Sequence, residues 1–266
     1  MKIGLLGFGR YRNALIEGSM AAGSFSAKDL LIFDVDKAKL NRFVRRHPGC
    51  RAVDQRLLLK EADVLVVGHI TNELAKALSS SDAQVITENK KKIYISIDAL
   101  LPYPNPNGYK IVHILNNYAT RVNKGVTGVY FPPKLAKERK LKKIVVKLFG
   151  KTGLLVFVNK RKDLLRVRMA AGSAVGLLCY FSLELQRAGA AYMPGMKLRE
   201  KLVKEAFLGV AELLNSGMSF EEIFETVQTP GGPTEAFLRD LKKIKVGETL
   251  RKTANIFFAH KYLYDE

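Results

Sequence analysis

Short apolar runs of strand length alternate with helical stretches through the first part of the chain. The runs that predict strands are residues 2–6, 30–33, 64–67, 93–97, 111–115, 126–131 and 154–158. Helical spacing over residues 13–22 and 36–46 follows the first two runs. Because alternating strands and helices are typical of a parallel sheet with crossover helices, this pattern predicts a doubly wound α/β sheet.

The pattern changes after Val158, where helical spacing replaces the short apolar runs. Helices are predicted over residues 163–187, 198–216, 219–227 and 234–263, with no further strand. The sequence therefore predicts two domains, a nucleotide-type domain over residues 1–160 and an all-helical domain over residues 161–266. Because so short a segment cannot bury such apolar helices alone, we expect them to pack against a second subunit in a homodimer or higher homo-oligomer.

The composition of the 266 residues is that of a folded soluble protein, with 47% hydrophobic and 26% charged residues. It excludes collagen-like, repeat and disordered chains. Cys50 and Cys179 are too few for a disulfide framework or a zinc cluster, so we expect both to be free in a reducing compartment. No spacing of His, Cys, Asp or Glu indicates a metal site.

The net charge is strongly positive, with 44 Lys and Arg against 25 Asp and Glu, or +19. Such an excess raises nucleic acid as a partner. The basic residues are spread along most of the chain, however, and form no zinc finger or aromatic RNA-binding motif. We therefore expect a solvated basic face that attracts anionic small molecules, and keep a specific polyanion site as the alternative.

Neither a signal peptide nor a membrane helix is predicted. The apolar run at residues 3–7 is short and broken by glycines. The longest charge-free stretch, residues 169–183, falls short of the roughly 20 apolar residues that a membrane helix needs. We interpret it as a buried helix and expect a cytoplasmic protein without a membrane partner.

A glycine turn follows the first predicted strand and is the first candidate for chemistry. The turn has the sequence Gly7-Phe8-Gly9-Arg10-Tyr11-Arg12. Gly7 permits a sharp turn, and Gly9 lets the backbone approach a pyrophosphate at the start of the next helix. The predicted cofactor-binding residues here are Gly7, Phe8, Gly9, Arg10, Tyr11 and Arg12. Residues 1–160 are thereby predicted to form a dinucleotide-binding Rossmann-like domain.

Asp34 ends the second predicted strand, the place where dinucleotide folds hold a ribose. Its carboxylate is placed to accept a hydrogen bond from the ribose 2′-hydroxyl and would repel a 2′-phosphate. We therefore predict NAD as cofactor, with NADP as the alternative. An aspartate at this point also suits a turn or a helix cap, and that interpretation stays open.

Arg12 does not fit the motif, whose third small residue normally allows the helix to pack closely on the strand. Two interpretations remain at this point. The side chain either obstructs the pyrophosphate, or swings outward and pairs with phosphate, as Arg10 would also be placed to do.

The order of motifs resembles that of pyrroline-5-carboxylate reductases. The similarity includes Gly7-x-Gly9, Gly18 after Ala14-Leu15-Ile16, and Asn117 followed by Gly125-Val126-Thr127. Its strongest element is residues 227–234, Val-Gln-Thr-Pro-Gly-Gly-Pro-Thr, which look like the family's V-T-S-P-G-G-T-T signature. The similarity extends over nearly the whole chain.

The resemblance implies an NAD(P)H-dependent reductase of 1-pyrroline-5-carboxylate, or a similar cyclic imine, by hydride transfer. It implies interleaved helices in a dimer and a substrate site between the nicotinamide and the Pro-Gly-Gly turn. On this basis Thr234 is the predicted catalytic residue. Its hydroxyl would hydrogen-bond the ring nitrogen, unless it only caps its helix. The predicted substrate-binding residues are Thr229, Gly231, Gly232 and Asn117.

Several site motifs depart from the family pattern. His69-Ile70-Thr71 stands where the family has Val-Lys-Pro, and Val35 where an NADP-binding arginine often stands. These losses leave open a catalytically silent paralogue with a binding or regulatory role, similar to late-competence-type proteins. His69 itself follows the third predicted strand and is a candidate proton donor or contact of the nicotinamide ribose. The alternative is a structural histidine bonded to a backbone carbonyl.

Overall fold

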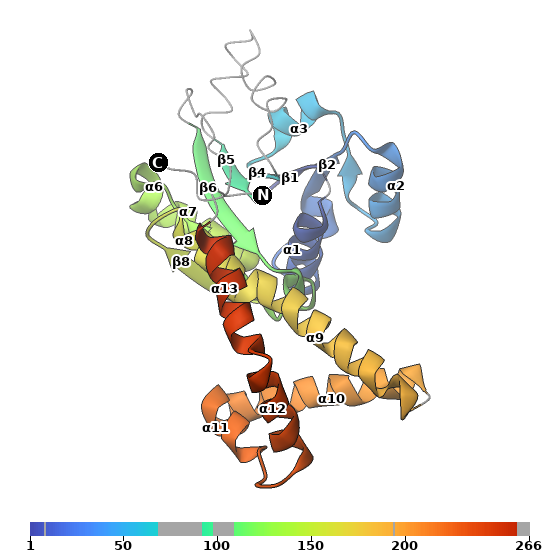
Figure 1. The fold of residues 1–266 in the computed structure, drawn as a ribbon. Helices are drawn as coiled ribbons and strands as arrows, with labels where there is room; N and C mark the ends of the chain where they lie inside the picture. The colour runs from blue at the N-terminus through green and yellow to red at the C-terminus, as the bar shows by residue number, and fades with distance from the viewer. Residues whose placement is uncertain (8, 69–91, 98–108, 194, 260–266) are drawn as a thin grey trace. The chain divides into compact units, whose positions relative to one another are not determined.

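The computed structural model describes residues 1–7, 9–68, 92–97, 109–193 and 195–259 (Figure 1). The contacts between Cα atoms divide the chain into two compact units, Met1–Val175 and a second that begins at Gly176. The predicted division near residue 160 lies before this point and remains a proposal.

The first unit is built on a mixed sheet whose order among the described residues is β3-β2-β1-β4-β5-β6-β7-β8. Its strands are β1 (Ile3–Leu6), β2 (Leu30–Phe33), β3 (Arg51–Ala52), β4 (Val64–Val67), β5 (Ile93–Ser96), β6 (Lys110–Asn116), β7 (Gly125–Tyr130) and β8 (Gly153–Val158). The seven predicted strands are confirmed, and only the two-residue β3 was not predicted. From β3 to β6 the order is that of a dinucleotide-binding fold, which confirms the predicted Rossmann-like class.

One strand pair is antiparallel, against the prediction of an all-parallel sheet. β7 runs antiparallel to β6, with Leu115 opposite Gly128, and β8 is again parallel to β7. Residues 117–124, which contain the 3₁₀ turn η2 (Tyr118–Val122), are the only connection between β6 and β7. A parallel crossover needs roughly a dozen residues or more, so this short connection forces the chain to turn back.

Helices cover both faces of the sheet, and the alternation along each strand separates two apolar clusters. The helices of this unit are α1 (Arg10–Ala21), α2 (Lys37–Arg46), α3 (Gln55–Glu61), α6 (Pro133–Ala136), α7 (Arg139–Phe149) and α8 (Asp163–Val167). One cluster joins α1, α2 and α7 to strand residues such as Ile32 and Val66. The other joins α3 to residues one position along, such as Leu31 and Leu65.

Helix α1 approaches η2 so closely that only glycine fits between them. Gly18 is buried in the last half of α1, and a Cβ built there would overlap the backbone carbonyl oxygen of Thr120. The Thr120 side chain is fully buried and its hydroxyl donates to the Asn117 carbonyl at 2.9 Å. The position of α1, and with it the loop at its start, therefore depends on this contact.

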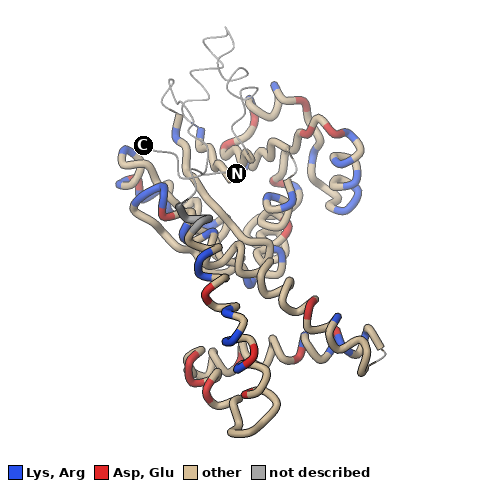
Figure 2. The backbone as a smooth tube through the Cα atoms, in the orientation of Figure 1, with Lys and Arg blue, Asp and Glu red and all other residues tan. Residues whose placement is uncertain are grey.

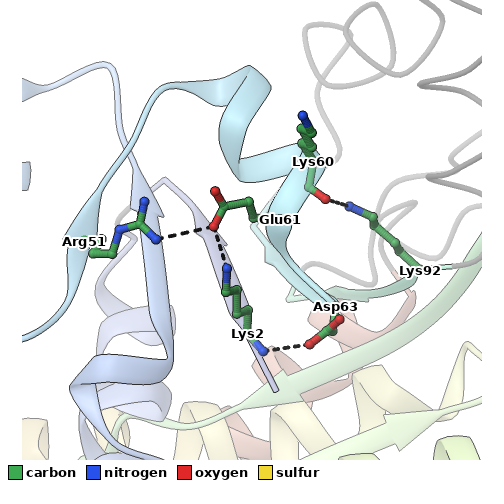
Figure 3. A network of polar contacts seen from close by, with 6 residues as sticks. All are labelled: Lys2, Arg51, Lys60, Glu61, Asp63 and Lys92. Atoms are coloured by element: carbon green, nitrogen blue, oxygen red, sulfur yellow. Dashed lines mark hydrogen bonds and ion pairs between the residues drawn. The ribbon is translucent and has the colours of Figure 1, made fainter.

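A polar network closes the edge of the sheet where the parallel strands begin (Figure 3). The Lys2 ammonium lies 2.7 Å from the Glu61 carboxylate, which also contacts Arg51 at 3.3 Å, and the Lys2 backbone N–H donates to Asp63 at 2.8 Å. The Lys92 ammonium donates to backbone carbonyls in the last turn of α3. Hydrogen bonding from Lys2, with the nearby positive charges, holds the pKa of the Glu61 carboxyl below its ordinary value. The network ties the beginnings of β1, β4 and β5 to α3.

The second unit is helical among its described residues, as predicted. Its helices are α9 (Ala174–Ala188), α10 (Met196–Asn215), α11 (Phe220–Thr226), α12 (Pro233–Lys243) and α13 (Val246–Ala259). The helix predicted over residues 234–263 is wrong in one respect, because α12 ends before Lys245, whose φ of 56° is left-handed. α8 and α9 are joined by the π-helical segment η4 (Arg168–Ser173).

The apolar helices of the second unit are largely exposed in the single chain. The segment Asp163–Ala191 has a mean hydropathy of 1.4 over its most apolar window, only 11% of which is buried, and by length and composition it could cross a membrane. The prediction that residues 169–183 form a buried helix is therefore wrong for one chain taken alone. On α10, large apolar side chains such as Leu198, Leu202 and Phe207 are also at least 41% exposed. A surface of this kind normally marks an interface.

His113 is a buried titratable group in the middle of β6, as expected for a structural histidine. Its side chain is 8% exposed, its ring lies 6.1 Å from that of Tyr130, and Nδ1 has no hydrogen-bond partner among the described residues. Burial, with a smaller effect of the Arg161 charge, lowers the pKa of His113 to about 4 from an ordinary 6.5. The imidazole is therefore neutral in the folded protein at neutral pH.

We predict that substituting Gly18 with Ala lowers the free energy of unfolding by about 2 kcal/mol, because the new methyl group displaces the Thr120 backbone. Gly150→Ala is the matched control. Gly150 has ordinary right-handed backbone angles, and a Cβ there would lie 3.4 Å from the Val146 side chain, a normal contact. Urea unfolding of both variants checks this, and equal effects at the two positions would contradict the close approach.

We further predict that His113 destabilises the protein in acid. The folded pKa is lowered, so its contribution to stability is complete above pH 6.5 and is lost as the pH falls from there towards 4. The loss approaches about 3 kcal/mol because each pKa unit corresponds to about 1.4 kcal/mol. Urea unfolding of wild type and His113→Phe over this range should give curves that separate on the acid side. Parallel curves would contradict the prediction.

Candidate functional site

The candidate ligand site lies at the carboxyl ends of β1 and β4. The chain runs outward from β1 through β2 to β3 and then returns to β4 on the other side of β1. Ligands of open α/β sheets bind in the crevice at such a reversal of strand order. Gly7 follows β1 and Gly68 follows β4, so both backbones border this crevice.

The glycine turn has the geometry predicted for it. Gly7 has a φ of +78°, a left-handed angle that favours glycine, and its N–H donates to the Phe33 carbonyl at 2.7 Å. Gly9 is extended and is the N-cap of α1, with no side-chain cap and no acidic residue in the first turn. The positive end of the α1 dipole is therefore not neutralised by its own first turn. Phe8 lies outside the described residues.

Arg10 and Tyr11 form the first turn of α1 and are both exposed, Tyr11 by 54%. The Tyr11 backbone carbonyl accepts a hydrogen bond from the Asn116 side chain at 3.1 Å. This bond joins the start of α1 to the carboxyl end of β6. Both side chains border the same turn as Gly9, where the sequence predicted cofactor contacts.

Asp34 follows β2 beside the glycine turn and is 7% exposed. Its Oδ1 accepts the Asp36 backbone N–H at 2.8 Å, so Asp34 forms a turn, as one of the two interpretations of this residue predicts. Asp36 in turn accepts the Lys39 N–H at 3.0 Å and caps α2. Val35 is 80% exposed at this rim. This turn does not exclude a hydrogen bond to a ribose, and that contact stays a prediction.

The Arg12 side chain folds inward, beneath the glycine turn. Its Nη1 donates to the Leu6 backbone carbonyl at the end of β1. Cβ atoms built on Gly7 and Gly9 would each lie 3.1 Å from a guanidinium nitrogen, and one built on Gly68 would overlap the guanidinium. The guanidinium is therefore directed inward, and its effect on a bound pyrophosphate stays a prediction.

Asn117 is buried beside η2, with both ends of its side-chain amide bonded inside the chain. Nδ2 donates to the Ala171 carbonyl at 3.2 Å, and Oδ1 accepts the Val126 N–H at 3.1 Å. It therefore joins the start of β7 to η4. Its predicted contact with substrate stays a prediction, and any such role would add to this structural one.

The Pro-Gly-Gly turn lies in the second unit, between α11 and α12. Gly231 has a φ of +73°, and its N–H donates to the Glu235 carboxylate at 2.7 Å, while the Gly232 N–H donates to the Thr229 carbonyl at 2.9 Å. The turn thus already binds a carboxylate. Gly232 is the N-cap of α12, so the helix has no side-chain cap, and the exposed Thr234 is the second helical residue. Thr234 therefore does not cap this helix, and its catalytic role stays a prediction.

Most of the predicted residues fall into two groups, and Asn117 belongs to neither because it is buried between β7 and η4. The group at the carboxyl edge of the sheet is Gly7, Gly9, Arg10, Tyr11, Arg12 and Asp34, and the group in the second unit is Thr229, Gly231, Gly232 and Thr234. His69 lies outside the described residues. Sequence reasoning missed Gly68, although it directly follows a predicted strand, and Glu235, an acidic residue in the first turn of a predicted helix. No cluster of metal-ligating side chains occurs in the described part of the chain.

Two protein-family models match the chain in the same order as the fold. Residues 2–99 match the family described as NADP oxidoreductase coenzyme F420-dependent. Residues 162–259 match the family described as pyrroline-5-carboxylate reductase dimerisation. The exposed apolar helices therefore lie in a segment whose family associates through it, which supports oligomerisation.

Curated relatives extend over almost the whole chain. A pyrroline-5-carboxylate reductase of Methanosarcina acetivorans is 26% identical over 251 residues, which cover 91% of this chain and 90% of that protein. Pyrroline-5-carboxylate reductase 2 of Bacillus subtilis is 22% identical over 260 residues, covering 94% and 90%.

Solved structures of such enzymes share the fold. The Plasmodium falciparum pyrroline carboxylate reductase, crystallised with NADP, has a TM-score of 0.80 at 20% identity and covers 97% of this chain and 95% of its own. The Streptococcus pyogenes 1-pyrroline-5-carboxylate reductase has a TM-score of 0.77 at 20% identity, covering 97% and 96%. These likenesses show the fold, while the two family models and the full-length relatives support a member of the pyrroline-5-carboxylate reductase family.

Proposed function

We propose that this protein is an NAD(P)H-dependent reductase that converts 1-pyrroline-5-carboxylate, or a similar cyclic imine, into the corresponding cyclic amine, proline in the first case. The observation that carries the proposal is the left-handed Gly7 turn at the start of an uncapped α1, with Asp34 beside it at the reversal of strand order. The names of the full-length relatives support the reaction.

The residues at the sheet edge suit a nicotinamide dinucleotide. The space that Gly9 leaves by lacking a Cβ admits a pyrophosphate to the backbone N–H groups at the start of α1, provided that the Arg12 side chain moves. The Asp34 carboxylate accepts hydrogen bonds from the adenosine ribose. When bound, the reduced nicotinamide supplies a hydride to the carbon of a protonated imine, which leaves an amine and the oxidised cofactor.

The residues of the second unit would hold the substrate. The Gly231 N–H, which binds the Glu235 carboxylate at 2.7 Å, donates instead to the substrate carboxylate, and the Thr229 hydroxyl adds a second donor. The Thr234 hydroxyl hydrogen-bonds the ring nitrogen and keeps the imine oriented. Because a protonated imine already accepts hydride, these residues act mainly by positioning the reacting carbon.

We propose NADH as the preferred cofactor, since a carboxylate at position 34 repels a 2′-phosphate and the exposed Val35 offers it no positive charge. We also propose a cytoplasmic homodimer in which α9 and α10 bury their apolar faces against the partner chain. The curated relatives are reductases by name and give no support to a catalytically silent paralogue.

The first prediction for this proposal concerns Thr234. Thr234→Ala should lower kcat for imine-dependent NADH oxidation about 100-fold, because the ring nitrogen loses its hydrogen-bond partner. Thr234→Ser keeps the hydroxyl and should retain most of the rate. The melting temperature of both variants should stay within about 2 °C of wild type, because Thr234 is exposed and does not cap α12.

A fully active Thr234→Ala would overturn the assignment of this residue. Absence of imine-dependent oxidation of both NADH and NADPH by the wild-type protein would overturn the proposed reaction itself.

The second prediction concerns Asp34. Asp34→Asn keeps an acceptor for the Asp36 N–H, so the turn is preserved, but it removes the charge that faces a 2′-phosphate. The ratio of dissociation constants for NADH and NADPH should shift at least about tenfold towards NADPH, or about 1.4 kcal/mol. Asp36→Asn, at an exposed cap of α2, should leave the ratio unchanged. Calorimetric titration with each cofactor measures the ratio, and an unchanged ratio in Asp34→Asn would contradict the prediction.

A further inference from the structure

We propose that the Arg12 side chain occupies the space in which the pyrophosphate of a dinucleotide binds. The side chain must move away before the cofactor binds, so this residue limits cofactor affinity. The inference rests on the proposed function and refines its cofactor site. It concerns a residue at which this chain departs from the glycine-rich motif, where a small residue normally stands.

The Arg12 guanidinium lies beside the glycine turn. Arg12 belongs to the first turn of α1, and its side chain passes back under the loop that precedes the helix. It is bordered by three glycines, at positions 7, 9 and 68, and Cβ atoms built on the first two would lie 3.1 Å from its nitrogens. The group therefore fills the gap between the ends of β1 and β4.

The space beside Gly9 is the place where a dinucleotide fold admits the pyrophosphate. In a dinucleotide fold the second glycine of the turn lacks a side chain so that the pyrophosphate can approach the backbone. Here the Arg12 Nη2 lies 3.1 Å from the position that a Gly9 Cβ would have. The guanidinium therefore borders the space beside Gly9 that the pyrophosphate would enter.

A hydrogen bond to the end of β1 holds the Arg12 side chain in place. Nη1 donates to the Leu6 carbonyl, a charge-assisted hydrogen bond in a half-buried place. A Cβ on Gly68 would overlap the guanidinium, so the glycine after β4 is what admits the group to the gap. A pyrophosphate that enters must break this bond and displace the group, and the free energy of that displacement is subtracted from cofactor binding.

The alternative role for Arg12 is a clamp that pairs with the phosphates, and it predicts the opposite sign. A clamp extends outward from the helix with its donors towards the ligand, and the exposed Arg10 on the same turn is better placed for that role. Arg12 instead points back towards the strand ends and donates to the backbone of β1. The geometry therefore favours a group that competes with the pyrophosphate over one that binds it.

The test is calorimetric titration of NADH and NADPH into full-length wild type, Arg12→Ala and Arg10→Ala. Removal of Arg12 should tighten binding of the better cofactor about tenfold or more, or about 1.4 kcal/mol. Arg10→Ala removes the same charge from the same helical turn without opening the gap, and should not tighten binding. Arg12→Gly, which restores the small third residue of the motif, is the second variant should Arg12→Ala fold poorly.

The outcomes separate this inference from the proposed function. Weaker or unchanged binding by both Arg12 variants would overturn the inference, while imine-dependent turnover by wild type would keep the function. Saturable binding by Arg12→Ala with none by wild type would support the inference and count against the function of the native chain. No binding of either cofactor by any variant would overturn both.

Discussion

The close approach of α1 to its surroundings is the constraint on which the candidate site depends. Gly18 has no side chain because the Thr120 carbonyl lies where one would be, and Thr120 is in turn held by the buried Asn117 beside it. At its other end, α1 begins directly after Gly9, so the same rigid helix carries the glycine turn to the ends of β1 and β4. A shift of α1 would move the turn, Arg12 and the positive end of the helix dipole together.

The amino ends and the carboxyl ends of the parallel strands carry different kinds of residues, and the candidate site lies at the carboxyl ends. The edge at which the strands begin is closed by the ion pairs and hydrogen bonds of Lys2, Glu61 and Asp63 (Figure 3). The opposite edge carries glycines and the cation of Arg12. Lys and Arg occur on α2 and α7 alike and on the second unit (Figure 2). A dispersed excess of +19 attracts anionic cofactors and substrates in general, whereas the glycine edge supplies the specific contacts.

Much of the fold could be predicted from the sequence because the strands are short, buried apolar runs. The strands at residues 30–33 and 64–67 have the predicted bounds. Buried parallel strands are continuous apolar runs, so their ends are easily recognised in the sequence. The antiparallel β7 could not be seen in the apolar pattern, because strand direction depends on the length of the connection. The end of α12 depends on the left-handed Lys245, which nothing in the local sequence required. The small β3 is an exposed two-residue strand without an apolar signal.

The candidate site was predictable in its residues more than in its contacts. Glycines at 7 and 9 identify the turn by their spacing. The direction of Arg12, however, depends on Gly68, which is 56 residues later in the sequence and follows β4, the strand beside β1. Likewise the Pro-Gly-Gly turn was visible, whereas its bond to the Glu235 carboxylate is a matter of geometry. The exposure of the apolar helices was not predictable either, because helical spacing does not show what an apolar face packs against.

The central claim, direct reduction of a cyclic imine by a bound nicotinamide, is tested most directly by following the hydride itself. Purified protein would be incubated with 1-pyrroline-5-carboxylate and NADH carrying deuterium at both C4 positions of the nicotinamide, and the product analysed by mass spectrometry. The account predicts proline that is one mass unit heavier, with the deuterium on the former imine carbon. Proline without deuterium, or no proline from either NADH or NADPH, would contradict it.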